Sequence, residues 1–413
     1  MLAGLGVVGR AILSAHLDAR LDVQVTDSDQ EALRSAVGSL SLDPLQWDVS
    51  EIPNNALDLP AITLTFKKDG DAGQVSNKLS APPILIESIA EKLSIKQDFF
   101  RFAQSRLRDD WILCSNTSTL RIRDIASVLE HPQRFCGMHF FMPVAQRDAV
   151  EVIASTATAE NESLQNEVLE RCCQHIKSLG KTPLLVKDSP GFIVNRMLSP
   201  YLNEAMVLLS QGATDQQIEQ AAIEYGMPMS PLELIDLIGT RTMFDAGRVY
   251  WQAFPSRIDP SPILPAMIKA KRAGKQSGVG FYEYQNQSKR RSGNLPPQTV
   301  EICNRYVRDR RAMDLSEVEM RLAATMWIEA ALLLREGTVS DAGLIARAMS
   351  GGLGYRHPRG WFGYFDNIGS HPLREFLNQH AKYSKSLVAP RVLLECLAHH
   401  SPSETLVYSS SSK

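Results

Sequence analysis

The feature that most constrains the fold of this chain is a regular alternation of short apolar runs with helical patterns over nearly the first half of its 413 residues. The apolar runs have the length of strands and end in polar or turn-forming residues. Strands that alternate with helices favour a parallel, doubly wound sheet, so we predict an α/β, Rossmann-like domain over residues 1–187. The predicted strands are LDVQVTD (21–27), AITLTF (61–66), PPILIESIA (82–90), WILCSNTS (111–118), RFCGMHFF (134–141), AVEVIAS (149–155) and TPLLVKD (182–188).

Beyond residue 187 the spacing of the apolar residues becomes helical, and two segments of the chain have the composition of loops. The segment KKDGDAGQVSNKLSAPP (67–83) is rich in turn formers, which predicts a mobile loop. The polar segment YQNQSKRRSGNLPPQ (284–298) indicates a linker. After the first domain we therefore predict a helical substrate and dimerisation domain (188–285), a linker (286–310) and a second helical domain (311–413).

The helical part of the chain contains an internal repeat. NEAMVLLSQG (203–212) resembles IEAALLLREG (328–337), with Glu, Ala, a Leu-Leu pair and Gly in register. The two segments continue in parallel to LIDLIG (234–239) and YFDNIG (364–369). Chance similarity between two amphipathic helices is the alternative, but the matching Gly and Asp positions favour duplication. We therefore predict two related all-α domains behind one Rossmann-like domain.

Composition excludes several classes of function. A net charge of -2 gives no case for nucleic acid as the main partner. The sequence has no apolar run of the roughly 18 residues that a membrane span needs, and its start lacks the features of a secretory signal, so we expect a cytoplasmic protein. The cysteines show neither a C-x-x-C pair nor metal-ligand spacing, which predicts reduced core residues and no metal site. They are Cys114, Cys136, Cys172, Cys173, Cys303 and Cys396.

A glycine pattern at the start of the chain predicts a dinucleotide site. Gly4, Gly6 and Gly9 fit G-x-G-x-x-G, which alone is weak evidence. A helical pattern follows, and a strand then ends in Asp27, where a carboxylate can bind the ribose hydroxyls. That acid would repel a 2′-phosphate, so NAD is favoured over NADP. Taken alone, Asp27 would be a turn residue, but the combination favours a cofactor site.

The strand expected before these glycines is almost missing, because only Met1, Leu2 and Ala3 precede Gly4. In this fold the first strand lies in the middle of the sheet, and its loss would leave buried backbone groups of two neighbours unpaired. Two explanations stay open. Further coding sequence lies upstream, which we favour, or the sheet is degraded and binds its cofactor poorly.

Several separate motifs occur in one order along the chain. They are IESIAEKLSIK (86–96), SNTSTLRIRDIASVLEHPQRFCGMHFFMPVAQRDAVEVI (115–153), KDSPGFIVNR (187–196) and GKQSGVGFYEY (274–284). They resemble the L-3-hydroxyacyl-CoA dehydrogenase family. The second helical domain adds a resemblance to the dehydrogenase part of multifunctional fatty-acid oxidation proteins, without their hydratase part. The resemblance implies NAD-dependent oxidation of (S)-3-hydroxyacyl-CoA to 3-oxoacyl-CoA in fatty-acid β-oxidation.

Two residues in these motifs suit the chemistry of alcohol oxidation. His139 directly follows apolar strand residues, at the position where open α/β sheets bind ligands, and imidazole is a suitable base near neutral pH. Glu151 on the next strand can accept the other imidazole N–H and fix the tautomer. A packing histidine and an exposed strand glutamate are the alternatives. The resemblance implies that these two form the catalytic pair, and that Ser118 and Asn195, otherwise helix caps, bind the substrate.

The same resemblance assigns Glu91 and Lys96 to the ribose and nicotinamide side of NAD; a pair on a helix surface is the alternative. Two departures from the family bear on the ligands. Met142 replaces an Asn that follows the two phenylalanines, and a thioether cannot supply the donors of an amide. Arg34 is the only basic residue between Asp27 and Lys67, where relatives contact CoA.

These departures keep two other functions open. One is a dehydrogenase of a free hydroxy acid from the same superfamily, and the other is a degenerate, non-catalytic family member that serves as a scaffold. The partner hypotheses are an acyl-CoA substrate, a homodimer through the helical domains and association with a thiolase. The duplicated domain is the alternative to a dimer, because it can cover the same surface within one chain.

Overall fold

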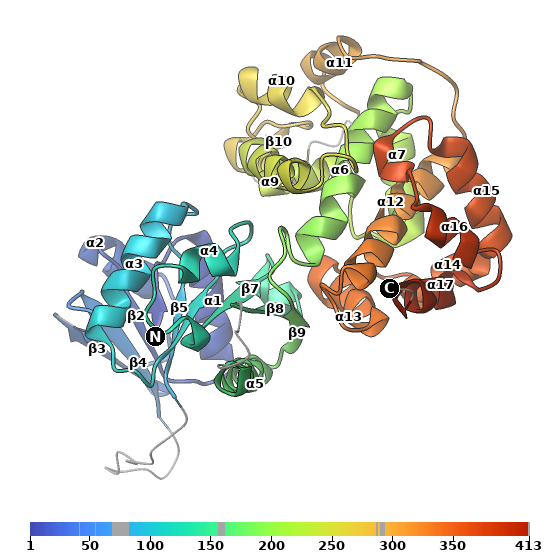
Figure 1. Ribbon diagram of the computed structural model, residues 1–413. Coiled ribbons are helices and arrows are strands. Elements are labelled where there is room, and N and C mark those ends of the chain that lie inside the picture. Colours follow the sequence, from blue (N-terminus) through green and yellow to red (C-terminus); the bar gives the residue numbers. More distant parts are fainter. Residues whose placement is uncertain are drawn as a thin grey trace. The chain divides into compact units, whose positions relative to one another are not determined.

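The computed structural model divides the chain into two compact units, Met1–Ser189 and Pro190–Lys413 (Figure 1). Most of the predicted loop 67–83 and part of the predicted linker lie outside the described residues. The subdivision of the second unit into two domains with a linker stays a prediction. The structure describes residues 1–40, 42–53, 55–67, 82–155, 162–285, 288–289 and 294–411.

A nine-stranded sheet in the order β3-β4-β2-β1-β5-β6-β7-β8-β9 forms the first unit, so the predicted Rossmann-like α/β class is confirmed. Strands β2, β1, β5, β6 and β7 run parallel. The sheet is mostly parallel, as predicted, but β4 is antiparallel to β2 and β3, and β8 is antiparallel to β7. The strands are β1 (Leu2–Ala3), β2 (Val23–Thr26), β3 (Trp47–Ile52), β4 (Ala61–Phe66), β5 (Ile84–Glu87), β6 (Ile112–Ser115), β7 (Phe135–Phe140), β8 (Ala149–Ala154) and β9 (Thr182–Val186).

Helices cover the sheet, and the apolar core lies between them and the strands. Buried side chains of α1, such as Ile12 and Leu13, pack with Val25 of β2 and Ile86 of β5 in one cluster. Asp29 begins α2 by accepting hydrogen bonds from two backbone N–H groups of the first turn, as N-cap residues do. The helices of this unit are α1 (Val7–Asp18), α2 (Gln30–Gly38), α3 (Leu93–Arg106), α4 (Ile122–Ala126) and α5 (Glu162–Ser178), with short 3₁₀ turns at Pro132–Arg134 and Val144–Gln146.

The short first strand occupies the middle of the sheet. Leu2 lies opposite Val25 of β2 on one side and Ile86 of β5 on the other. Backbone hydrogen bonds continue past the strand, because the Gly4 N–H donates to the Thr26 carbonyl at 3.0 Å and the Ser88 N–H donates to the Ala3 carbonyl at 2.8 Å. Even a two-residue strand therefore pairs with both neighbours and places the glycine turn at the carboxyl end of the sheet.

Two histidines connect α1 with α5 on one face of this sheet. The Nε2 atoms of His16 and His175 are 3.0 Å apart, and His16 Nδ1 lies 2.8 Å from the Ile12 carbonyl. Burial lowers the pKa of His16 to about 4. Burial and the charge of His16 together lower the pKa of His175 to about 3. Both rings are therefore neutral in the folded protein at neutral pH.

We expect this pair to make the first unit sensitive to acid. Unfolded histidine binds protons below about pH 6.5, whereas the folded pair does not. Its contribution to stability is therefore complete above pH 6.5 and is lost as the pH falls towards 4. Thermal unfolding followed by circular dichroism from pH 7 to 4.5 should show a weaker pH dependence for His175→Gln. His371→Gln, at an 87% exposed side chain, should behave like the wild type. Equal slopes for all three proteins would contradict the prediction.

The described residues of the second unit form helices and an antiparallel pair of two-residue strands (Figure 1). No helix among the described residues is long and apolar enough to cross a membrane. Helix α11 lies inside the predicted linker. The elements are α6 (Val194–Gln211), α7 (Asp215–Tyr225), α8 (Pro231–Ile238), α9 (Thr240–Ala253), α10 (Ile263–Lys269), β10 (Tyr284–Gln285), β11 (Ser288–Lys289), α11 (Pro297–Asn304), α12 (Leu315–Arg335), α13 (Ala342–Arg347), α14 (Gly360–Ile368), α15 (Ser370–His380), α16 (Arg391–Cys396) and α17 (Pro402–Ser411).

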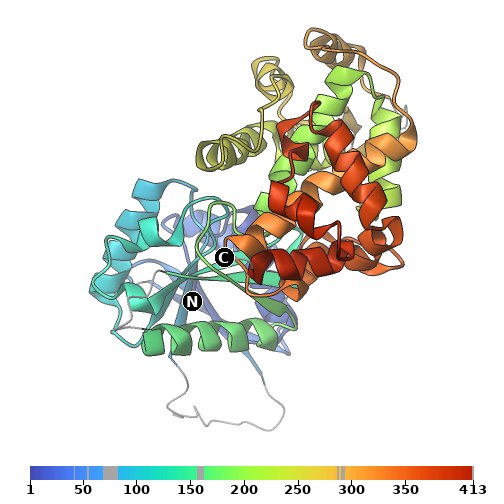
Figure 2. The same ribbon diagram turned by 45° about the vertical axis from the view of Figure 1, so that its right-hand side comes forward.

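The two helices that carry the sequence repeat, α6 and α12, lie side by side (Figure 1 and Figure 2). Buried ion pairs join the two helices, and residues at equivalent positions of the repeat exchange partners. Arg321 of α12 donates to Glu204 of α6 at 2.8 and 2.5 Å, and the equivalent Arg196 of α6 donates to Glu329 of α12.

Each of the two arginines also donates to a second acceptor, and the two acceptors again lie at equivalent positions of the repeat. Arg321 Nη1 donates to Gln211 at 2.7 Å, and Arg196 Nη1 donates at 2.6 Å to Glu336, which is the equivalent position of the repeat. An isologous interface produces this exchange, in which position i contacts j and j contacts i. The contacts therefore support the duplication that the sequence predicts.

The Arg321–Glu204 pair should be essential for the stability of this unit, because both side chains are fully buried. Arg321→Ala would leave the Glu204 charge without its main partner, and we expect a loss of about 3–5 kcal/mol. Arg391→Ala is the control, because it breaks an exposed i,i+4 pair with Glu395 and should cost less than about 0.5 kcal/mol. Urea unfolding followed by circular dichroism measures both values, and equal losses would refute the prediction.

Candidate active site

His139 and Glu151 form a buried pair on adjacent strands. They lie directly opposite each other in the antiparallel β7–β8 ladder, and His139 Nδ1 is 2.7 Å from Glu151 Oε2. The Glu151 side chain is fully buried, and that of His139 is 9% exposed. With its proton on Nδ1 donated to the carboxylate, the imidazole has its lone pair on Nε2 and can accept a proton there. The predicted pair is therefore formed.

The glycine turn between β1 and α1 has the geometry of a phosphate-binding loop. Gly4 has φ +90°, and a Cβ added to it would lie 2.7 Å from the Ser88 carbonyl oxygen. A Cβ on Gly9 would lie 2.0 Å from the Gly4 carbonyl oxygen, whereas one on Gly6 would meet nothing within 4 Å. The first and third glycines thus permit the tight turn, and the second leaves room for a diphosphate at the helix N-terminus.

Asp27 lies directly after β2, and its half-buried carboxylate is tied to the glycine turn. Oδ2 accepts a hydrogen bond from the Leu5 N–H at 3.0 Å, and Oδ1 accepts one from the Asp29 N–H at 3.2 Å. No acidic side chain lies in the first turn of α1. The residues that would hold NAD therefore fit it: an N-terminus suited to the diphosphate and a fixed carboxylate suited to the ribose.

A buried charge cluster follows β5. Lys96 is 1% exposed and its Nζ lies 2.5 Å from Glu87 Oε1 and 3.4 Å from Glu91 Oε2. Ser115 Oγ donates to the other Glu87 oxygen at 2.7 Å. The alternative of a surface pair on a helix is wrong, because Lys96 is buried and Glu91 precedes α3. Their contact with the cofactor stays a prediction.

Glu91 also organises the turn after β6. Its Oε1 accepts hydrogen bonds from Thr117 Oγ1 at 2.7 Å, from the Ser118 N–H at 2.9 Å and from the Thr119 N–H at 3.1 Å. Burial opposes its ionisation, but the charge of Lys96 and these hydrogen bonds outweigh burial and lower the pKa of Glu91. Glu91 is therefore an anion that fixes the Ser118 loop.

Two further residues, Ser118 and Asn195, are predicted to contact the substrate. The Ser118 hydroxyl lies 3.3 Å from Glu91, so the structure joins one predicted substrate residue to one predicted cofactor residue. Asn195 lies in the first turn of α6 in the second unit, and its helix-cap alternative is wrong, because the N-cap residue of α6 is Ile193. Their contacts with a substrate stay predictions.

Sequence reasoning missed part of this site. Glu87 and Asn116 both stand at or just after the carboxyl ends of parallel strands, which is the signal that could have found them. Glu87 is fully buried and binds Lys96, and Asn116 Oδ1 accepts from the Phe140 N–H at 2.9 Å. Asn116 thereby ties the end of β6 to the end of β7, next to His139.

The sequence matches two models of one protein family. Residues 2–189 match the model described as 3-hydroxyacyl-CoA dehydrogenase, NAD binding domain, and residues 191–284 match 3-hydroxyacyl-CoA dehydrogenase, C-terminal domain. The first unit is thus an NAD-binding domain. Residues beyond 284 lie outside both matches.

Curated relatives include the fatty acid oxidation complex subunit alpha of Acinetobacter baumannii strain SDF, which is 33% identical over 322 residues, 77% of this chain and 44% of that protein. The Acinetobacter baylyi protein of the same name is 33% identical over 315 residues, 75% of this chain and 43% of that one. The chain therefore spans less than half the length of these relatives.

Solved structures agree with this assignment. (S)-3-Hydroxybutyryl-CoA dehydrogenase from Ralstonia eutropha is 29% identical, with a TM-score of 0.54 over 69% of this chain and 98% of that one. The 3-hydroxybutyryl-CoA dehydrogenase of Escherichia coli K12 covers 100% of this chain and 99% of its own, with a TM-score of 0.68 and 22% identity. At this level of identity the latter likeness shows the fold alone.

Gly9→Ala tests the glycine turn. The added methyl group would collide with the Gly4 carbonyl oxygen. We therefore expect the free energy of unfolding to fall by about 1–3 kcal/mol. We expect the affinity for NADH to fall by at least about 10-fold. Gly38→Ala is the control, because a Cβ there meets nothing within 4 Å and should be neutral or slightly stabilising. NADH fluorescence titration and thermal unfolding provide the measurements. Normal NADH affinity in Gly9→Ala would disprove this role of the turn.

Proposed function

Because the chain belongs to the 3-hydroxyacyl-CoA dehydrogenase family, we propose that it oxidises (S)-3-hydroxyacyl-CoA to 3-oxoacyl-CoA, as in fatty-acid β-oxidation. The observation that carries the proposal is the buried His139–Glu151 pair, with 2.7 Å between Nδ1 and Oε2. Oxidation of a secondary alcohol removes one proton from oxygen and one hydride from carbon. NAD⁺, when bound, accepts the hydride and becomes NADH.

His139 takes the proton. The O–H bond of the substrate breaks, its electrons form the carbonyl as the hydride leaves the carbon, and the proton moves to Nε2. A positioned general base of this kind contributes about 10²- to 10⁴-fold to the rate. The histidine is suited to the task because its ring is held by the backbone register of two strands and by one hydrogen bond.

Glu151 supports the imidazole without touching the substrate. Its carboxylate accepts a hydrogen bond from the Nδ1–H, which keeps the lone pair on Nε2, and it stabilises the imidazolium that forms when Nε2 accepts the substrate's proton. The carboxylate is fully buried, so water screens this interaction little. In the reverse direction the same imidazolium returns its proton to the alkoxide.

The residues proposed to hold NAD are Gly4, Gly6, Gly9, Asp27, Glu91 and Lys96. The glycine turn would contact the diphosphate, and Asp27 would bind the adenosine ribose. The Lys96 ammonium is paired with Glu87 and Glu91, so Lys96 would act on NAD by fixing the position of Glu91. Ser118 and Asn195 are assigned to the substrate on the family resemblance.

One observation favours a second candidate, the oxidation of a free hydroxy acid. Arg34 is the only basic residue between Asp27 and Lys67. Its guanidinium is paired with Glu51 of β3, with 2.6 Å between Nη2 and Oε2. The positive charge that could attract CoA phosphates from this segment is therefore balanced by a carboxylate.

The proposed partners follow from the relatives. The curated relatives are named as alpha subunits of a fatty acid oxidation complex, which supports an association of this chain with another subunit, and a thiolase is the partner that we propose. A homodimer through the helical unit is the other proposal. The reciprocal contacts of α6 and α12 support the alternative in which the duplicated half covers that surface within the chain.

His139→Gln should lower kcat by about 10²- to 10⁴-fold, because glutamine keeps a donor for Glu151 but cannot take the proton. The reaction is followed as NADH oxidation with acetoacetyl-CoA. NADH affinity and melting temperature should stay close to those of the wild type. His371→Gln is the control and should retain full activity, because its side chain is 87% exposed. A His139→Gln enzyme with undiminished kcat would refute the assignment.

The substrate class is tested with the wild-type protein. We expect acetoacetyl-CoA to be reduced with NADH, and free hydroxy acids with NAD⁺ to react at least 100-fold more slowly in kcat/KM. A preference for the free acids would establish the second candidate. NADH binding without turnover of either substrate would favour the scaffold.

A further inference from the structure

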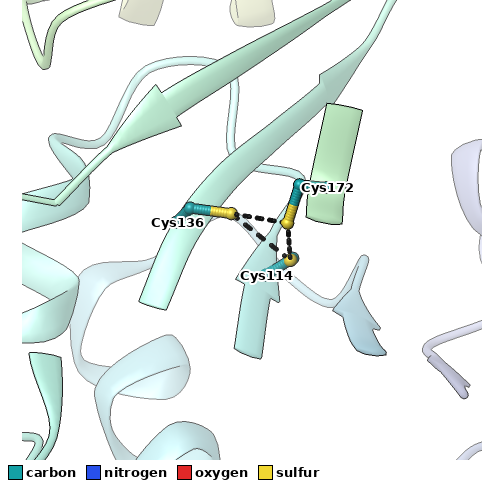
Figure 3. Close-up of side chains that lie close together, drawn as sticks. All are labelled: Cys114, Cys136 and Cys172. Atoms are coloured by element: carbon teal, nitrogen blue, oxygen red, sulfur yellow. Dashed lines mark hydrogen bonds between the residues drawn. The ribbon is translucent and has the colours of Figure 1, made fainter. Parts of the chain in front are cut away.

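Three cysteine side chains meet in the core of the first unit (Figure 3). Cys114 of β6, Cys136 of β7 and Cys172 of α5 are each 0% exposed. The Sγ atoms of Cys114 and Cys136 are 3.4 Å apart, those of Cys136 and Cys172 are 3.4 Å apart, and those of Cys114 and Cys172 are 3.8 Å apart. They form a closed triangle of sulfur atoms.

The fold builds this triangle from distant parts of the chain. Cys114 and Cys136 are direct neighbours in the β6–β7 register, and α5 packs on these strands and brings Cys172 to them. Within the part of the chain that the structure describes, this is the one group of three or more His, Cys, Asp or Glu residues whose ligand atoms lie within 4.8 Å of one another. Sequence spacing gave no sign of it.

We propose that these three thiols form a binding site for one thiophilic metal or metalloid atom that takes three sulfur ligands. Trivalent arsenic, supplied as arsenous acid, is the atom that fits this site. The site is separate from the proposed reaction and does not depend on it.

Geometry argues against a structural zinc site. Zinc in closed sites takes four ligands, and bonds of about 2.3 Å in a tetrahedron place the sulfur atoms about 3.8 Å apart. Two edges of the triangle are shorter, and the described residues provide three ligands to it. Trivalent arsenic instead forms a pyramid on three sulfur atoms with its lone pair at the apex, and the pyramid holds these atoms closer together.

The net charge of the occupied site also favours trivalent arsenic over Zn²⁺ and Cu⁺. Three thiolates around Zn²⁺ would leave one net negative charge in the core, and around Cu⁺ they would leave two, which is costly without compensation. Arsenous acid reacts with three thiols as As(OH)₃ + 3 RSH → As(SR)₃ + 3 H₂O. Three As–O and three S–H bonds break, three As–S bonds and three water molecules form, and no electrons are transferred. Reactants and product are all neutral.

Burial determines how the ion enters and what it does. Because all three thiols are fully buried, binding requires a local opening of α5 and should be slow. Once bound, the ion would crosslink β6 and β7 with α5 and stabilise the folded unit by mass action. Strand β7 also carries His139, so the crosslink would lie on the strand of the proposed base.

The test is native mass spectrometry of the reduced full chain after incubation with arsenous acid. The wild type should gain the mass of one arsenic atom less three hydrogen atoms, and its melting temperature should rise. Cys172→Ser should lose this adduct and bind arsenic at least 10-fold more weakly. Cys173→Ser is the matched control, because it changes the next residue on the same helix, outside the triangle, and should bind like the wild type.

Cys136→Ala is a second variant in case serine disturbs the core, and circular dichroism establishes that each variant is folded. The proposal is overturned if the wild type gains no arsenic, if a folded Cys172→Ser or Cys136→Ala variant binds it as well as the wild type, or if the adduct retains a hydroxyl on arsenic. Cysteine-dependent uptake of Zn²⁺ or Cu⁺ in preference to arsenic would also overturn it.

Discussion

The register of β7 against β8 is the constraint on which the proposed chemistry depends. Antiparallel pairing places His139 directly opposite Glu151, and a shift of β8 by one residue would place the Glu151 side chain on the opposite face of the sheet from His139. The pair needs no loop to assemble it, since both residues are on strands whose backbones are hydrogen-bonded to each other. Asn116 adds a tie from β6 to the backbone of Phe140. The proposed base is therefore held by hydrogen-bonded strands rather than by a loop.

Polar groups at the carboxyl edge of the sheet form hydrogen-bonded networks, in which Glu87 and Lys96 are buried and Glu91 is partly exposed. Glu87 contacts both Lys96 and Ser115, and Glu91 gathers hydrogen bonds from the turn after β6. A buried charge is tolerated when it is paired and hydrogen-bonded, and such a network favours one arrangement of the loops around it. The second unit uses the same device in the reciprocal arginine pairs of α6 and α12. Both units thus contain buried ion pairs, which join residues 9 positions apart in the first unit and 117 or 133 positions apart in the second.

Much of the first unit could be predicted from local pattern. The apolar runs that became β2, β4 and the strands from β5 to β9 are visible because buried strands are nearly continuously apolar. Strand β3 (Trp47–Ile52) was missed because its residues after Trp47 are largely exposed and give no apolar run. The direction of β8 was not predictable either, because a strand in the middle of a sheet has the same composition whether its neighbour is parallel or antiparallel.

The sequence by itself determined the glycine turn, the acid after β2, the order of the motifs and the repeat, because each depends on residue type and spacing along the chain. Only the tertiary structure decided that Lys96 is buried against Glu87, that Asn116 braces β7, that the arginines of the repeat exchange partners, and that Cys114, Cys136 and Cys172 converge. These contacts join residues from 9 to 140 positions apart. Such contacts leave no periodic signal in the sequence, because they depend on strand order and on the packing of helices against the sheet and against one another.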